Sequence, residues 1–94
     1  MDKLFQRSAD VLTRKVAGET LLIPVRGNLA DMQRIFALNE LGEFIFGRLD
    51  GKTTLGRIAE EVVSAFTVAA AEAERDVRAF VSELRKADLV SEVR

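Results

Sequence analysis

Side chains that carry chemistry are scarce in this sequence, which has no His and no Cys among its 94 residues. Without thiolates it offers no disulfide, no iron–sulfur cluster and no thiolate zinc site, and without imidazole it lacks the commonest metal ligand and general base. The serines therefore have no imidazole to activate them as nucleophiles; they are Ser8, Ser64, Ser82 and Ser91. These absences argue against redox, zinc and serine-hydrolase chemistry.

Carboxylates and glycines offer two further routes to chemistry, and neither has the required spacing. Glu60 and Glu61, or Glu72 and Glu74, would be near neighbours on a helix and point to different faces, so an acid–base pair is not expected. The segment GRLDGKTT, residues 47–54, comes nearest to a phosphate-binding loop, but its order and spacing differ from GxxxxGK[ST]. We therefore predict a protein that is not an enzyme and has no catalytic residue, metal site or cofactor.

Charge is balanced along the chain, with 14 Lys and Arg against 15 Asp and Glu. A formal net charge of −1 supplies no excess of one sign to attract nucleic acid or an anionic membrane. The alternative hypothesis is a winged-helix DNA-binding or regulatory protein, whose phosphate contacts would be Arg75, Arg78, Arg85 and Lys86. Four acidic residues are interleaved with these basic ones, so such a face would be neutralised.

The first residues, MDKLFQRSADVLTRK, lack the apolar core of a signal peptide, and no uninterrupted apolar stretch approaches the roughly 20 residues of a membrane span. We therefore expect a soluble, cytoplasmic protein that binds neither nucleic acid nor membrane.

A β-hairpin is the first element expected along the chain. VLTRKV and TLLIPV, residues 11–16 and 20–25, are rich in β-branched and aliphatic side chains and are joined by Ala17-Gly18-Glu19. Pro24 cannot donate a ladder hydrogen bond, so the second strand should end there or present that position at an unpaired edge. Gly27-Asn28 suits a turn, and MQRIFAL, residues 32–38, is expected to form a third strand.

Helical signals replace the strand pattern from Asn39 onward. Asn39 is expected to cap a first helix from Glu40 to about Leu49, with Gly51 as the left-handed residue that follows it. Phe46 lies well round this helix from its apolar face, so it either packs on the sheet or forms an exposed contact.

Two longer helices complete the pattern. The second follows a cap at Thr53 or Thr54 and carries one apolar stripe of Leu55, Ile58, Ala59, Val62, Val63 and Phe66. The third should run over about residues 70–87, before a short extended segment at Leu89-Val90.

This order of elements indicates a single α+β domain spanning residues 1–94. Its N-terminal three-stranded antiparallel sheet, about residues 11–38, is followed by three helices, about residues 40–87, in an order similar to a winged helix-turn-helix. The apolar third strand would be an edge of that sheet, and an open apolar edge is either a liability or a binding site.

The capping and core residues from Leu38 to Val90 together resemble the PqqD family, named for pyrroloquinoline quinone synthesis protein D. The shared pattern is L-N-x-x-G-x-x-I-x-x-x-L-D-G from residue 38, T-x-x-x-I-A from residue 54, D-V-x-x-F-V-x-x-L from residue 76 and DLV at 88–90. The family usually has Gly where Asp88 stands; Asp tolerates the left-handed conformation better than most residues, so the helix end should be kept at a slight cost.

The resemblance implies a RiPP recognition element, a small domain that binds the leader of a ribosomally made precursor peptide and presents it to a separate modifying enzyme. In the family the leader adds to the third strand and lies against the third helix, a contact that needs no reactive side chain. Carried over, the strand edge is Arg34, Ile35, Phe36 and Ala37.

The same resemblance implies a helix wall for the leader. Its candidate pocket lining is Val77, Val81 and Leu84, which would equally serve as ordinary core, and its candidate rim is Arg78 and Arg85, placed to meet leader carboxylates. The expected partners are the precursor peptide and a modifying enzyme of the radical SAM class, with a homodimer as a further possibility if two edge strands pair. Quinone synthesis in particular is not indicated.

Overall fold

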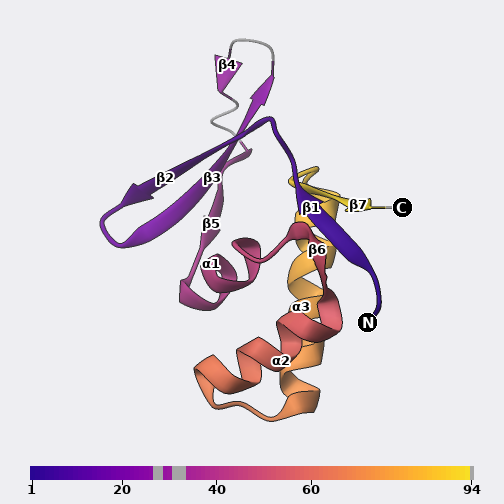
Figure 1. Ribbon diagram of the computed structural model, residues 1–94. Coiled ribbons are helices and arrows are strands. Elements are labelled where there is room, and N and C mark those ends of the chain that lie inside the picture. Colours follow the sequence, from indigo (N-terminus) through magenta and orange to yellow (C-terminus); the bar gives the residue numbers. More distant parts are fainter. Residues whose placement is uncertain (27–28, 31–33, 94) are drawn as a thin grey trace.

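The computed structural model describes residues 1–26, 29–30 and 34–93, which form two small antiparallel sheets and three helices (Figure 1). The expected α+β class, with a three-stranded antiparallel sheet followed by three helices, is confirmed. The expected turn at Gly27-Asn28 lies outside the described residues, as do Met32 and Gln33. No helix in the described part is long and apolar enough to cross a membrane.

The first sheet is built on the expected hairpin, in which β2 (Val11–Val16) pairs with β3 (Glu19–Arg26). The two turn residues, Ala17 and Gly18, have φ of 51° and 85°. A two-residue turn with both residues left-handed matches the twist of the flanking strands and sets the register. β5 (Phe36–Leu38) pairs with the other side of β3, so the third strand is shorter than the expected 32–38.

β3 does not end at Pro24, because this residue occupies a place where its missing N–H costs little. Pro24 lies opposite Val11 of β2, at a position where the main-chain groups of the pair point away from each other. On the other side of β3, β5 pairs with residues 20–22 and the short β4 (Leu29–Ala30) with residues 25–26. Among the described strands, Pro24 thus lies between the residues of β3 that pair with β5 and those that pair with β4.

A second sheet, with the order β6-β1-β7, was not expected apart from the start of its last strand. β1 (Leu4–Arg7) is central and pairs antiparallel with β6 (Asp50–Thr54) and β7 (Val90–Val93). Main-chain pairing accounts for much of this sheet, because Phe5 is the only buried residue of β1 and β6 contains no large apolar residue.

The three helices begin where their capping residues stand. In α1 (Glu40–Phe46) the Asn39 side chain accepts from the amide of Gly42. In α2 (Leu55–Phe66) the Thr54 hydroxyl accepts from the amide of Arg57, which selects Thr54 over Thr53 as the cap. α3 (Ala70–Lys86) is the longest, as expected.

α1 ends about one turn earlier than expected. Gly47 closes it in a right-handed conformation, whereas Gly51, expected to follow the helix, has φ of 79° within β6 where the register with β1 shifts. Leu49 is nevertheless fully buried. The apolar spacing thus identified an inward residue but not the end of the helix.

One hydrophobic cluster joins both sheets to the helices. It contains Phe5 of β1, Leu22 of β3, Leu38 of β5 and the inward faces of all three helices. Phe46 is buried at 7% exposure, and the Arg7 guanidinium lies 5.9 Å from the centre of its ring, so Phe46 packs beside the second sheet.

Asp88 keeps the end of α3 as the sequence suggested. Its φ is 60°, and its amide donates to the carbonyl of Arg85 at 3.1 Å, while the amide of Leu89 donates to that of Leu84 at 2.9 Å. These two bonds satisfy carbonyls at the helix end in the Schellman arrangement, in which Gly is the usual left-handed residue.

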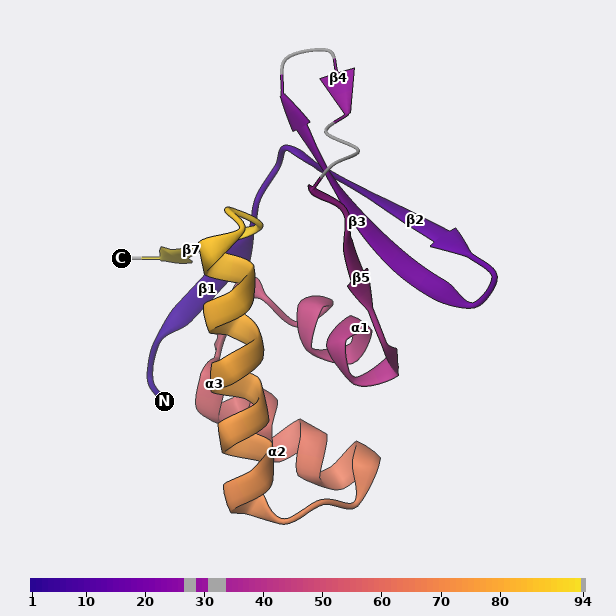
Figure 2. The same cartoon turned by 180° about the vertical axis from the view of Figure 1, so that it is seen from behind.

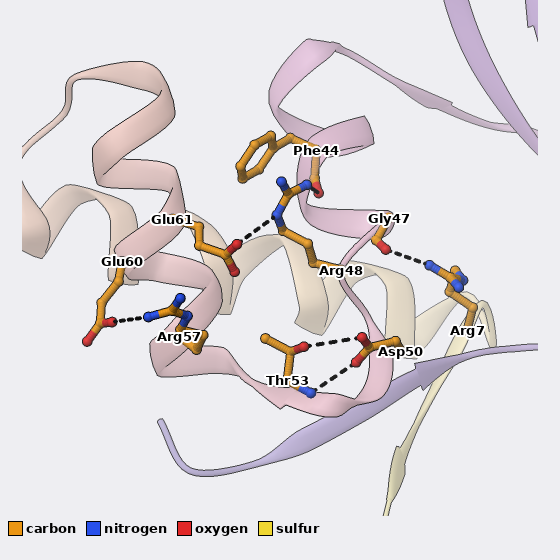
Figure 3. Close-up of polar contacts among 9 residues, drawn as sticks. All are labelled: Arg7, Phe44, Gly47, Arg48, Asp50, Thr53, Arg57, Glu60 and Glu61. Atoms are coloured by element: carbon orange, nitrogen blue, oxygen red, sulfur yellow. Dashed lines mark hydrogen bonds and ion pairs between the residues drawn. The ribbon is translucent and has the colours of Figure 1, made fainter.

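Polar contacts tie α1 to its neighbours (Figure 3). The Arg48 guanidinium lies 3.5 Å from the centre of the Phe44 ring and pairs with Glu61 of α2, with 3.5 Å between Nε and Oε1. Arg7 of β1 donates to the carbonyl of Gly47 at 2.8 Å. These contacts join α1 to α2 and to the second sheet, so the strand that precedes α1 is held in place.

Candidate functional site

β5 forms the edge of the first sheet that lies nearest to α3 (Figure 2). Among the described residues it pairs only with β3, through Phe36 opposite Leu22, Ala37 opposite Leu21 and Leu38 opposite Thr20. Its second side therefore has no partner strand in the part of the chain that the structure describes, which is the condition for strand addition.

The register shows which main-chain groups face this open side. In a two-residue hairpin the residues flanking the turn exchange hydrogen bonds. The main-chain N–H and C=O of Glu19, and of every second residue of β3 after it, therefore point toward β2. The amide of Val25, six residues after Glu19, donates to the carbonyl of Asp10 at 2.8 Å, as this alternation requires. The main-chain N–H and C=O of Thr20 and Leu22 consequently point toward β5.

It follows that the main-chain N–H and C=O of Ala37 point away from β3. Phe36 and Leu38 lie opposite residues of β3 that point toward them, so they occupy the hydrogen-bonded positions of the ladder. Ala37 occupies the intervening position, where the N–H and C=O of both strands point outward. The amide and carbonyl of Ala37 are thus directed to the open side.

The side chains along this edge are partly apolar. Ile35, just before the strand, is 37% exposed, and Ala37 is also exposed. Phe36 is half-buried and meets Phe80 of α3 edge to face, with ring centres 6.3 Å apart. Arg34 is exposed and, with Ile35, precedes the strand instead of belonging to it.

The residues expected as pocket lining on α3 are core residues in the structure. Val77 and Leu84 are 0% exposed and Val81 is 3% exposed, within the cluster that holds the domain together. Their side chains therefore support the helix from inside.

The two arginines expected at the rim lie on the far side of α3. From Phe80, which faces β5, Arg78 and Arg85 are roughly 160° and 140° around the helix. Nε of Arg78 lies 3.2 Å from the sulfur of Met1, and the Arg85 guanidinium lies 5.8 Å from the centre of the Phe5 ring in β1. Both belong to the β1 side, so neither stands at the rim of the β5 edge.

Three other residues of α3 were missed as candidates. Phe80 reaches the edge strand through Phe36. Asp76 and Glu83, four residues before and three after Phe80, share its face of the helix, so the side of α3 toward β5 is acidic. The spacing of Asp76, Phe80 and Glu83 was visible in the sequence, but their facing toward β5 follows only from the Phe36–Phe80 contact.

A polar cluster fastens the first sheet to α1. The hydroxyl of Thr20, a residue 3% exposed, donates to Oε2 of Glu43 at 2.8 Å, and Nζ of Lys15 lies 3.3 Å from Oε1. The Thr20 hydrogen bond, followed by that of Lys15, lowers the pKa of Glu43. This cluster holds the hairpin, and so β5, against the helix that follows it.

The described residues contain no group of three or more acidic side chains that could hold a metal ion.

Comparison with known proteins identifies a family and a fold. The family model for coenzyme PQQ synthesis protein D (PqqD) matches residues 19–90. No curated protein matches the chain by sequence.

Two solved structures have a similar fold. One is TbiB1 in complex with the TbiA(beta) leader peptide, at 21% identity and a TM-score of 0.73, covering 92% of this chain and 94% of that one. The other is lasso peptide synthetase B1 complexed with the leader peptide, at 21% identity and a TM-score of 0.75, covering 93% of this chain and 96% of that one.

Proposed function

The chain belongs to the PqqD family, and from that premise we propose that it binds the leader of a ribosomally made precursor peptide by strand addition to β5. The observation that carries the proposal is the outward-facing main chain of Ala37 on a strand edge without a partner among the described residues. An added strand would satisfy these groups and gain affinity from main-chain hydrogen bonds.

Side chains beside the edge would select among peptides. Ile35 and the Phe36–Phe80 pair offer apolar contacts, and Asp76 and Glu83 place negative charge on the facing helix. Opposite charges across an interface favour the correct partner and suppress wrong ones. The preferred leader therefore has apolar residues at alternate positions with basic residues nearby, in contrast to the acidic leader that rim arginines would have met.

The protein would act as an adaptor and not as an enzyme. A recognised leader carries its attached core peptide to a separate modifying enzyme in the cytoplasm, and that chemistry resides in the enzyme. For this partner we propose a radical SAM enzyme. One solved neighbour of this chain is itself named as a lasso peptide synthetase component, so another component of such a synthetase is the alternative partner. Purifying the enzyme encoded beside the gene, and assaying it for an iron–sulfur cluster, separates the two.

A titration tests the binding proposal. A synthetic leader from the neighbouring precursor gene is added to the isotope-labelled protein, and amide shifts are followed by NMR. We expect the largest changes at residues 35–37 and around Phe80, with micromolar or tighter affinity. Changes confined to α2, or no binding at all, would contradict the proposal.

A further inference from the structure

A second surface of α3, away from the β5 edge, has the features of a binding site. A cavity of about 280 Å³ lies between α3, the first residues of the chain and the start of α2. It is lined by Met1, Lys3, Phe5, Leu55, Arg78, Val81, Ser82 and Arg85. Because Arg78 and Arg85 point away from the face of Phe80, the cavity and the β5 edge lie on different sides of the same helix.

The floor of this cavity is apolar and its rim is basic. Phe5, Leu55 and Val81 are buried, at 3%, 6% and 3% exposure. The side chains of Lys3 and Arg85 at the rim remain more than half exposed. None of the lining residues is acidic.

The rim cations are incompletely neutralised. Nζ of Lys3 and NH1 of Arg85 approach the same oxygen of Glu92, at 3.9 and 3.6 Å. Arg78 forms no ion pair with any described residue, and its Nε contacts the sulfur of Met1 instead. Glu92 thus pairs with two of the three rim cations, and Arg78 pairs with no described carboxylate, so the site carries a local surplus of positive charge above an apolar floor.

The chemistry that complements such a site is a carboxylate beside an apolar side chain. Guanidinium groups bind carboxylates through paired N–H donors, and a desolvated apolar floor favours an aromatic or aliphatic group. Sites for drug-sized ligands have volumes of about 300–1,000 Å³. A cavity slightly below that range suits one large apolar side chain of a peptide segment, with an acidic neighbour at the rim.

We propose that this cavity docks an acidic, apolar segment of the modifying enzyme, on the side of α3 opposite the bound leader. The identity of the partner rests on the proposed function, whereas the charge and shape of the cavity do not. The leader itself fits less well, because a strand added to β5 would have to pass around α3 to reach the cavity. Helix α3 would then separate two partners, one bound on each side.

The test compares two double variants of equal charge change. Arg78→Gln with Arg85→Gln removes two rim cations, and Arg75→Gln with Lys86→Gln removes two exposed cations of the same helix outside the cavity. Each protein is titrated separately with the purified enzyme encoded beside the gene and with the synthetic leader, after its melting temperature has been recorded.

We expect the rim variant to bind the enzyme roughly tenfold more weakly and to bind the leader with unchanged affinity, while the control variant matches the wild type. Ser82→Glu, at an exposed position of the lining, should weaken enzyme binding without unfolding the protein, and Ser82→Gln should not.

Three results would overturn the inference: no binding of the enzyme to the wild type, equal weakening by both double variants, or a loss of leader binding in the rim variant. Failure of the leader to bind the wild type would instead contradict the proposed function. The docking inference would still hold in that case if the rim variant binds the enzyme more weakly than the wild type does.

Discussion

The two sides of α3 differ in what they offer a partner. Toward β5 the helix presents Phe80 with Asp76 and Glu83, beside a strand whose main-chain groups are open to a partner strand. Toward β1 it presents Arg78 and Arg85 around an apolar cavity, where side chains and not main-chain groups are exposed to a partner. The helix carries equal numbers of acidic and basic residues, yet its side toward β5 is acidic and its side toward β1 is basic. The balanced composition of the sequence does not reveal this separation of charge.

The largest effect confined to one side of α3 is expected from a substitution at Ala37. Ala37→Pro removes one outward N–H and leaves the bonds of Phe36 and Leu38 to β3 intact, a position that Pro tolerates in an edge strand. We expect leader binding to weaken at least tenfold, about 1.4 kcal/mol or more, because a hydrogen bond is lost and the ring obstructs the added strand. Calorimetric titration measures the affinity.

Ala37→Val is the matched control for this variant, because it retains the amide and suits a strand. Thermal unfolding should show similar stability for the Pro and Val variants. If Ala37→Pro unfolds the protein, the amide of Ala37 is bonded within the sheet and the assigned direction is incorrect. The affinity for the modifying enzyme should be the same in both.

The aromatic contact sharpens the comparison. Phe80→Leu keeps most of the buried volume but removes the ring that meets Phe36 at 6.3 Å. We expect leader affinity to fall severalfold, and stability to fall by about 1 kcal/mol, since the substitution nearly conserves volume. Enzyme affinity should not change. An equal loss on both sides of α3 would show that the variant acts by loosening the helix.

The Thr20–Glu43 bond ties the sheet of β5 to α1 and has a pH signature. Because the pKa of Glu43 is lowered in the folded state, its ionised form adds stability above the unfolded pKa of about 4.3, and this stability is lost as pH falls through the folded value. Thr20→Val should weaken this dependence and lower stability at pH 7. Urea unfolding at several pH values measures both.

Thr13→Val provides the control for this pH series, since Thr13 is an exposed β2 residue for which the structure shows no side-chain hydrogen bond. Its acid dependence should match that of the wild type. A similar change in both Thr variants would remove the role assigned to the Thr20 hydroxyl.

The smallest expected effect is a change in stability at Asp88. This residue ends α3, so a substitution there should affect neither binding side selectively. Asp88→Gly should stabilise the protein by about 0.5–1 kcal/mol, because Gly adopts the observed φ of 60° without a side-chain penalty. Asp88→Ala should destabilise it relative to Gly at the same position. Affinities for the leader and the enzyme should be unchanged in both. A destabilising Gly variant would mean that the Asp side chain stabilises the helix end.

Local chemistry made much of the first sheet and the helices predictable. The Ala17-Gly18 turn, the Asn39 and Thr54 caps and the stripe of α2 each act over a few residues, and the observed elements follow them closely. The second sheet was missed because its information is not local. β6, with the sequence DGKTT, has no apolar alternation and becomes a strand only by pairing with β1.

The candidate site was predictable only in part, for the same reason. An apolar strand at the end of a hairpin sheet indicated where an edge would lie, and Phe36 and Ala37 are in that strand. The stripe of Val77, Val81 and Leu84 defined the inward face of α3 without showing which flank would meet β5. Packing of Phe36 against Phe80 decides that flank, and it places Arg78 and Arg85 on the other one.

Amide hydrogen exchange at Ala37 tests the central claim most directly. In the free protein the Ala37 amide should exchange much faster than those of Phe36 and Leu38, and saturation with leader should slow it to a comparable rate. An Ala37 amide that is already protected in the free protein, or whose exchange is unchanged when the leader is bound, would contradict strand addition at this edge.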